Sequence, residues 1–134
     1  MSEELVLKVQ EMLKEETWTR ATITNYSKND LIALSEIVEK AREENCSEAV
    51  KAVCDEQISP TKDSIIALFI SGMFGLKEGK LDNNYLVNLV DFFQKNHKEQ
   101  IVVYICETIL DIDSNNKLAL RTLAEYYRSS GSEK

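Results

Sequence analysis

The sequence predicts an all-α fold of about seven helices, stacked as antiparallel helical hairpins, and three observations carry this prediction. Apolar residues recur three and four positions apart along almost the whole chain, which is the period of an amphipathic helix. The 134 residues include only four glycines and one proline, too few for the many tight turns of a β-sandwich or barrel. The connections are short, so neighbouring helices must run antiparallel.

Each helix is predicted from its own apolar face and its own boundary residues. The predicted ranges are 3–15, 29–44, 46–57, 60–78, 82–96, 98–111 and 116–130. Ser27 and Asp30 resemble a capping box at the start of the second helix, and Asn45 marks the turn after it. Asp82 is the expected N-cap of the fifth helix.

The fourth helix is the most apolar of the seven. We predict Ser59 as its N-cap and Pro60 as its first residue, because Pro suits the first helical position. Apolar residues cover most of its circumference, which predicts that it is packed on several sides. Gly72 and Gly75 are expected to allow a close helix crossing, and Gly79 to end the helix.

The segment 16–28 interrupts the helical pattern with four threonines, which disfavour helix. We therefore divide the chain into 1–28, a helix with a Trp-Thr-Arg connector, and 29–134, a helical repeat domain. Trp18 and Arg20 in the connector form a candidate interaction hot spot. The alternative is that Trp18 is a core anchor and that Arg20 pairs with a nearby carboxylate.

Two segments near the C-terminus match each other at an offset of 34 residues. Leu86, Leu89, Val90 and Phe93 correspond to Leu120, Leu123, Ala124 and Tyr127. This period, together with the run Leu-Ala-x-x-Tyr-x-x-x-Gly over 123–131, resembles the tetratricopeptide repeat family. Ser114 stands where that family usually has Pro, and His97 where it usually has Gly. The resemblance implies a short TPR-like α-solenoid, whose hairpins share one core; the alternative is a generic antiparallel bundle.

The helix predicted over 116–130 looks like the first member of a hairpin without its second member. We therefore expect an exposed apolar strip on this helix, and we expect the chain to be the N-terminal part of a longer protein. An uncovered edge of this kind could also pair with a second copy of the chain.

The tetratricopeptide resemblance implies a concave groove made by the first helix of each hairpin. The partner-binding residues that it implies are Asn84, Val87, Asp91, Gln94, Lys95, Leu118, Arg121, Glu125, Arg128 and Ser129. A groove of mixed charge suits an extended or helical peptide. The alternative is an ordinary solvated helix face.

The chain carries no pattern that indicates catalysis, a metal site or a cofactor. His97 is the one histidine, and no phosphate-binding glycine loop occurs. Cys46, Cys54 and Cys106 are expected to be reduced core thiols of a cytoplasmic protein. The segment 111–116 is interpreted as a turn and a helix cap, since it lacks the glycine and glutamate of a calcium loop. The net charge of −7 argues against direct contact with nucleic acid or an anionic membrane.

The segment 15–26, Glu-Glu-Thr-Trp-Thr-Arg-Ala-Thr-Ile-Thr-Asn-Tyr, resembles the opening of long, N-terminally extended bacterial transcription elongation factors of the GreA type. In that family, acidic residues at the tip of a coiled coil act in transcript cleavage, and these 134 residues contain no such hairpin. The resemblance therefore implies a non-catalytic protein-interaction module, with the elongation-factor module downstream and RNA polymerase as the candidate partner. The alternatives are a helical-bundle dimerisation domain and the regulatory part of an enzyme whose active site lies downstream.

Overall fold

The computed structural model of the chain describes residues 2–15, 27–59, 62–79 and 84–130. Within these ranges the chain forms seven helices, which confirms the all-α class. The helices are α1 (Ser2–Lys14), α2 (Lys28–Glu43), α3 (Ser47–Asp55), α4 (Ile65–Lys77), α5 (Asn84–Lys95), α6 (Glu99–Ile112) and α7 (Lys117–Ser130). Two short strands, β1 (Ile58–Ser59) and β2 (Lys62–Asp63), pair antiparallel before α4, with Ile58 opposite Asp63.

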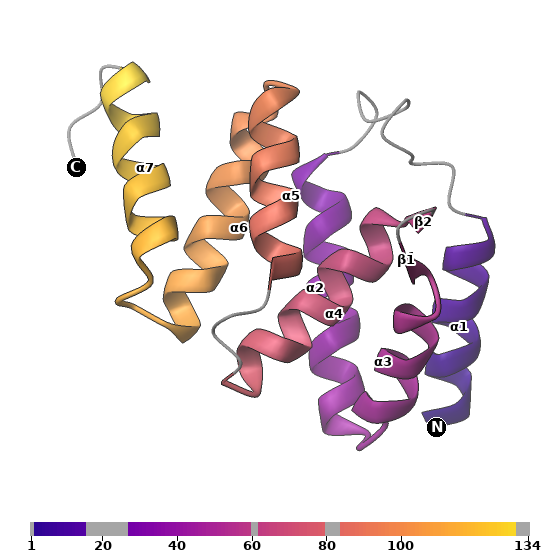
Figure 1. The fold of residues 1–134 in the computed structure, drawn as a ribbon. Helices are drawn as coiled ribbons and strands as arrows, with labels where there is room; N and C mark the ends of the chain where they lie inside the picture. The colour runs from indigo at the N-terminus through magenta and orange to yellow at the C-terminus, as the bar shows by residue number, and fades with distance from the viewer. Residues whose placement is uncertain (1, 16–26, 60–61, 80–83, 131–134) are drawn as a thin grey trace.

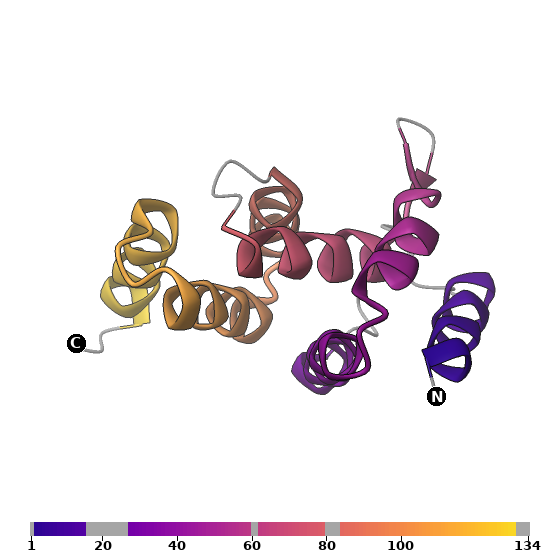
Figure 2. The ribbon, with the colours of Figure 1, turned by 90° about the horizontal axis from the view of Figure 1, so that it is seen from below.

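The helices lie in a row, with α1 at one end and α7 at the other (Figure 1). The view from below shows the same order (Figure 2). In the middle of the row α4 packs against α2, α3 and α5, and at the end of the row α7 packs against α6. The row agrees with stacked hairpins, while the TPR-like form of the α-solenoid stays a prediction.

The middle of the core is supplied by α4, as its composition predicts. Every residue from Ile65 to Leu76 is buried. The hydroxyl of buried Ser71 is satisfied, because it donates to a carboxylate oxygen of Asp55 at 3.0 Å. At the end of the helix Lys77 pairs with Glu39 of α2, and this hydrogen bond holds the pKa of Glu39 below its ordinary value.

The predicted start of this helix is wrong. The prediction placed Ser59 as N-cap and the helix from residue 60, whereas Ser59 belongs to β1 and the helix begins at Ile65. The N-cap is Ser64, whose hydroxyl accepts a hydrogen bond from the backbone N–H of Ala67 at 3.0 Å. Two serines were available as caps, and the strand pair takes the first one. Pro60 lies outside the described residues.

Three helices end as the sequence predicts or nearly so. Asn45 follows α2 with φ of 58°, and Gly79 follows α4 with φ of 82°. The backbone N–H of Cys46 donates to the carbonyl of Ala41, and that of Asn45 donates to the carbonyl of Arg42, which is the pairing of a Schellman motif.

The period found in the sequence recurs in the helix ends. The helices α2, α4 and α6 end at residues 43, 77 and 112, spacings of 34 and 35 residues.

The predicted close crossing is confirmed at Gly72. A Cβ atom at this position would lie 2.8 Å from both Cγ and Cδ2 of Leu86, closer than carbon atoms approach. Leu86 on α5 thus rests directly on the backbone of α4. Only glycine leaves room for this contact.

The two segments that match at an offset of 34 residues lie in different surroundings. Leu86 is 4% exposed, whereas its counterpart Leu120 is 48% exposed. The residue 34 positions after Gly72 is Cys106, which is fully buried and brings a side chain to the place that glycine leaves open. The buried residues of α7 are Ala119 and Thr122. They are not the residues that correspond, at the offset of 34, to the buried residues of α5.

Candidate functional site

A groove lies between α5 and α7 over the first half of α6; we call it the polar groove because most of its lining residues have a polar group. It encloses about 230 Å³. Its lining residues are Gln94 of α5, Glu99 and Val102 of α6, and Thr122, Glu125, Tyr126 and Ser129 of α7. Val102 and Thr122 are buried and form the floor, whereas Glu99 and Glu125 are exposed carboxylates above it.

The turn between α5 and α6 fixes one wall of the polar groove. His97 has φ of 60°, the conformation usual for glycine. The backbone N–H of Lys98 donates to the carbonyl of Phe93 at 2.9 Å, and that of His97 to Gln94 at 3.1 Å. This Schellman motif ends α5 beside Gln94 and starts α6 at Glu99.

The turn between α6 and α7 fixes the other wall. The side-chain oxygen of Asn116 accepts a hydrogen bond from the backbone N–H of Ala119 at 3.0 Å, and so caps α7. Asp113 accepts from the side-chain amide of Asn116 at 3.4 Å. The interpretation of this segment as a turn and a helix cap is confirmed. Further along α7, the Thr122 hydroxyl hydrogen-bonds with the thiol of Cys106 on α6.

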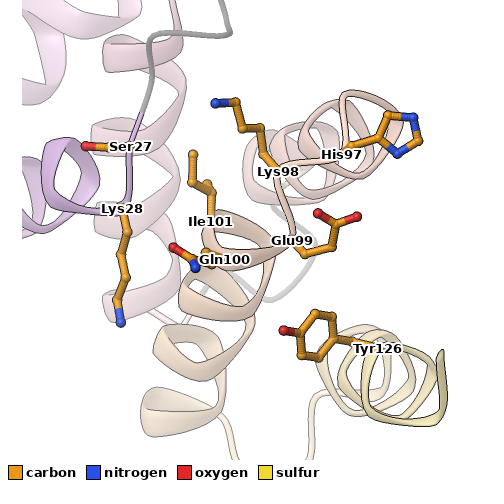
Figure 3. Close-up of a pocket in the computed structure, with 8 residues that line it drawn as sticks. All are labelled: Ser27, Lys28, His97, Lys98, Glu99, Gln100, Ile101 and Tyr126. Atoms are coloured by element: carbon orange, nitrogen blue, oxygen red, sulfur yellow. The ribbon is translucent and has the colours of Figure 1, made fainter. Parts of the chain in front are cut away.

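A second hollow of about 520 Å³ adjoins the polar groove and shares Glu99 and Tyr126 with it. Its remaining lining residues are Ser27, Lys28, His97, Lys98, Gln100 and Ile101. In Figure 3 Lys28 extends from the start of α2 and Tyr126 extends from α7 toward α6, while the ring of His97 points away from Lys28. The hollow thus lies where α2 and α6 both begin. The positive ends of these two helix dipoles and the side chains of Lys28 and Lys98 all contribute positive charge there.

The two helices beside this hollow are tied together by a pair of hydroxyl groups. The side-chain oxygens of Ser35 on α2 and Tyr104 on α6 lie 2.7 Å apart. The ammonium of Lys28 lies 6.0 Å from the centre of the Tyr104 ring, within range of a cation–π contact. These contacts join α2 to α6 beside the hollow.

The structure brings some of the predicted groove residues together. Gln94, Glu125 and Ser129 line the polar groove. Arg121 and Arg128 are exposed on α7 but do not belong to its lining.

The other predicted residues lie apart from the polar groove. Val87, Asp91 and Lys95 are exposed on α5, where Asp91 and Lys95 form an ion pair at 3.0 Å. Leu118 is half-buried on α7, and Asn84 is the first residue of α5. The predicted hot spot at Trp18 and Arg20 lies outside the described residues.

Sequence reasoning missed Glu99, Val102, Thr122 and Tyr126. The resemblance pointed to the first helix of each hairpin, whereas the start of α6, a second helix, forms the base of the polar groove. A usable signal was present in His97, because a histidine at a glycine position marks a tight turn that brings its neighbours together.

The side chains that line this site supply carboxylate, amide and hydroxyl groups. Among the residues that the structure describes, no cluster of three or more His, Cys, Asp or Glu could hold a metal ion. Cys106 beneath the polar groove is fully buried, and burial raises the pKa of its thiol to about 11. A thiol in this state is a weak nucleophile at neutral pH. The described helices include none long and apolar enough to cross a membrane.

The fold places this chain among all-helical proteins built from a row of short helices, with an open groove on the surface. No family model matches the chain, and no solved structure matches it significantly. It is 40% identical over 111 residues, 83% of its length, to a GreA-associated domains protein of Treponema pallidum. It is 35% identical over 120 residues, 90% of its length, to the transcription elongation factor GreA of Borreliella burgdorferi.

These relatives confirm the resemblance to long GreA-type proteins and extend it from the segment 15–26 to most of the chain. The chain spans 17% of the length of the Treponema protein and 13% of the length of the Borreliella protein. It is therefore similar to one segment of each of these longer proteins.

Proposed function

We propose that this chain is a non-catalytic protein-interaction module of a GreA-type transcription elongation protein, acting in the cytoplasm. Its partner in this proposal is RNA polymerase, and its contact surface is the polar groove. The observation that carries the proposal is the 35% identity to a transcription elongation factor GreA over 90% of the chain. The chain accounts for a small share of that protein, so a docking role beside a separate catalytic part fits its size.

The chemistry of the polar groove supports a polypeptide ligand with a basic side chain. Glu99 and Glu125 stand above a floor that Val102 and Thr122 form. Two carboxylates over a part-apolar floor suit a lysine or arginine whose stem packs below while its charge stays above. The hydroxyl of Tyr126 adds a donor and acceptor at the junction with the second hollow.

The test is a binding measurement with purified RNA polymerase. We expect the immobilised wild-type chain to retain the polymerase. The paired change Glu99→Gln and Glu125→Gln should weaken retention at least about tenfold, because each charge-assisted hydrogen bond contributes about 1.5–3 kcal/mol. A failure of the wild-type chain to retain the polymerase would contradict the choice of partner.

The chain offers a closely matched control. Glu36 lies in the middle of α2 and Glu48 in the first turn of α3, and both are exposed. The paired change Glu36→Gln and Glu48→Gln removes two carboxylate charges, as the groove variant does. Glu48 matches Glu99 because both lie in the first turn of a helix, and Glu36 matches Glu125 because both lie within a helix. Retention should therefore stay at the wild-type level.

A second paired change separates the polar groove from the outer face of α7. Arg121 and Arg128 are exposed but do not line the polar groove. If Arg121→Glu with Arg128→Glu abolishes retention while Glu99→Gln with Glu125→Gln does not, the polymerase contacts the outer face of α7 and the assignment of the groove is wrong.

A further inference from the structure

One face of α7 is apolar and partly exposed. We call it the α7 ridge; it consists of Leu120, Leu123, Ala124 and Tyr127. Leu120 is 48% exposed and Ala124 is exposed, while Leu123 and Tyr127 are half-buried. The matching residues of α5 are all buried.

Cations border the α7 ridge along its exposed side. Lys117 precedes Leu120 by three positions, Arg128 follows Ala124 by four, and Arg121 lies between them on the same side of the helix. All three side chains are exposed. The face as a whole is an apolar strip with a positive margin.

The opposite end of the row carries the complementary surface. A hollow of about 370 Å³ lies between α1 and the start of α3, lined by Glu3, Val6, Leu7, Cys46 and Ala49. Leu7 is 60% exposed at its rim. Glu3, Glu4 and Glu11 are exposed on α1 around Leu7, together with Lys8, so α1 gives this α1–α3 hollow a net negative margin.

We propose that copies of this chain associate head to tail, with the α7 ridge of one copy seated in the α1–α3 hollow of the next. The apolar surfaces are a projecting strip and a hollow, and the margins have opposite charge. A symmetric contact of two α7 ridges would instead bring Lys117, Arg121 and Arg128 against their own copies, and a symmetric contact of two α1 helices would oppose glutamates. Like charges facing each other disfavour both symmetric contacts.

The arrangement of the helices makes this contact intermolecular. Because α1 and α7 are at opposite ends of the row (Figures 1 and 2), the ridge of a copy cannot reach the hollow of the same copy. A head-to-tail contact therefore continues the row, as stacked helical units do, and gives open chains of copies.

The first measurement is the mass of the purified chain by light scattering over a series of concentrations. The mean mass should rise above 15.3 kDa as concentration increases, and the rise should weaken with added salt. A chain that stays at 15.3 kDa at every concentration and low salt would overturn the proposal, and would mean that the α7 ridge is left for another partner.

Two single variants and their mixture test the head-to-tail geometry. Leu7→Glu and Leu120→Glu should each weaken association at least about tenfold, because each places a charge in an apolar contact. In an equal mixture, the intact ridge of the Leu7→Glu copy can meet the intact hollow of the Leu120→Glu copy. The mixture should therefore form 1:1 dimers that grow no further, since both remaining ends carry glutamate.

The control is Ala33→Glu, which adds the same charge at an exposed position on α2, away from both ends of the row. It should leave the rise in mass unchanged. Circular dichroism should show wild-type helix content for all variants, since each replaced side chain is largely exposed. Association that Leu120→Glu abolishes, that Leu7→Glu leaves intact and that mixing does not restore would indicate a symmetric α7 contact and overturn the head-to-tail arrangement.

Discussion

At the scale of single residues, His97 is held in a backbone conformation that suits glycine. Its φ of 60° lies in the left-handed region, which costs about 1 kcal/mol for a residue with a Cβ atom. We expect His97→Gly to raise the free energy of unfolding by about 0.5–1 kcal/mol, since part of the gain is offset by the greater freedom of glycine in the unfolded chain. Urea denaturation followed by circular dichroism measures this change.

Asn45 provides the control for this prediction. It has φ of 58° at the end of α2 and makes the same Schellman pairing as His97. Asparagine tolerates this conformation better than most residues. Asn45→Gly should therefore change stability by only a few tenths of a kcal/mol, and a larger gain at Asn45 than at His97 would contradict the argument from backbone conformation.

At the scale of helices, the contact between α4 and α5 depends on the missing side chain at Gly72. Gly72→Ala would place a Cβ atom 2.8 Å from the side chain of Leu86, and Leu86 is buried and cannot swing into solvent. Overpacking costs about 1–3 kcal/mol, whereas alanine improves helix propensity by about 1 kcal/mol. We expect a net loss of about 1 kcal/mol, measured by thermal or urea unfolding.

The same change should have the opposite sign once the obstructing atoms are gone. Leu86→Ala removes both Cγ and Cδ2, the two atoms within 2.8 Å. In that background Gly72→Ala should stabilise the protein, because only the gain in helix propensity remains. A Gly72→Ala effect that is the same in both backgrounds would show that the close crossing does not restrict this position.

The sequence predicted helix faces and helix ends well where one local interaction decides them. Asp30 at the start of α2 accepts hydrogen bonds from the backbone N–H of Ser27 at 2.8 Å and from its hydroxyl at 3.0 Å, and Gly79 ends α4. The start of α4 was missed because Ser59 and Ser64 are both acceptable caps, and only the pairing of β1 with β2 selects between them.

The candidate site was harder to predict because it depends on how the helices rotate against each other. The match at an offset of 34 residues pairs Leu120 with Leu86, but Cys106 stands in place of Gly72 at the corresponding position of the preceding helix. Where α6 carries the side chain of Cys106, α7 turns a different face toward it and buries Ala119 and Thr122. As a result Arg121 and Arg128 lie outside the polar groove, and Thr122 and Tyr126 line it.

At the scale of the whole molecule, a row of helices need not unfold in one step. In a row, each helix is stabilised mainly by its neighbours, and α7 at the end is packed against α6, while α4 in the middle packs against α2, α3 and α5. The end of the row at α7 should therefore open at a lower free energy than the middle.

The three buried cysteines report on this difference. Cys54 at the end of α3 and Cys106 on α6 are both fully buried, and Cys46 is 6% exposed. Cys106 is covered by α7 through its hydrogen bond with Thr122. Loss of α7 from the row would expose Cys106 and leave α4 and its neighbours in place, so this thiol should become reactive before the others.

We expect a thiol reagent under native conditions to label Cys106 through local opening and Cys54 through global unfolding. The raised pKa of Cys106, about 11, keeps its thiol protonated in the closed state, so reaction requires opening of the structure. Mass spectrometry of peptides from the wild-type chain gives the labelling rate at each cysteine, corrected by the rate in the urea-unfolded chain. The urea dependence of protection scales with the surface that the opening exposes. The protection of Cys106 should therefore fall only slightly with added urea, whereas the protection of Cys54 should fall as steeply as the free energy of global unfolding. Equal protection with equal urea slopes at both cysteines would mean that the row unfolds as one cooperative unit, and that the contact of α7 with α6 is as strong as the contacts in the middle of the row.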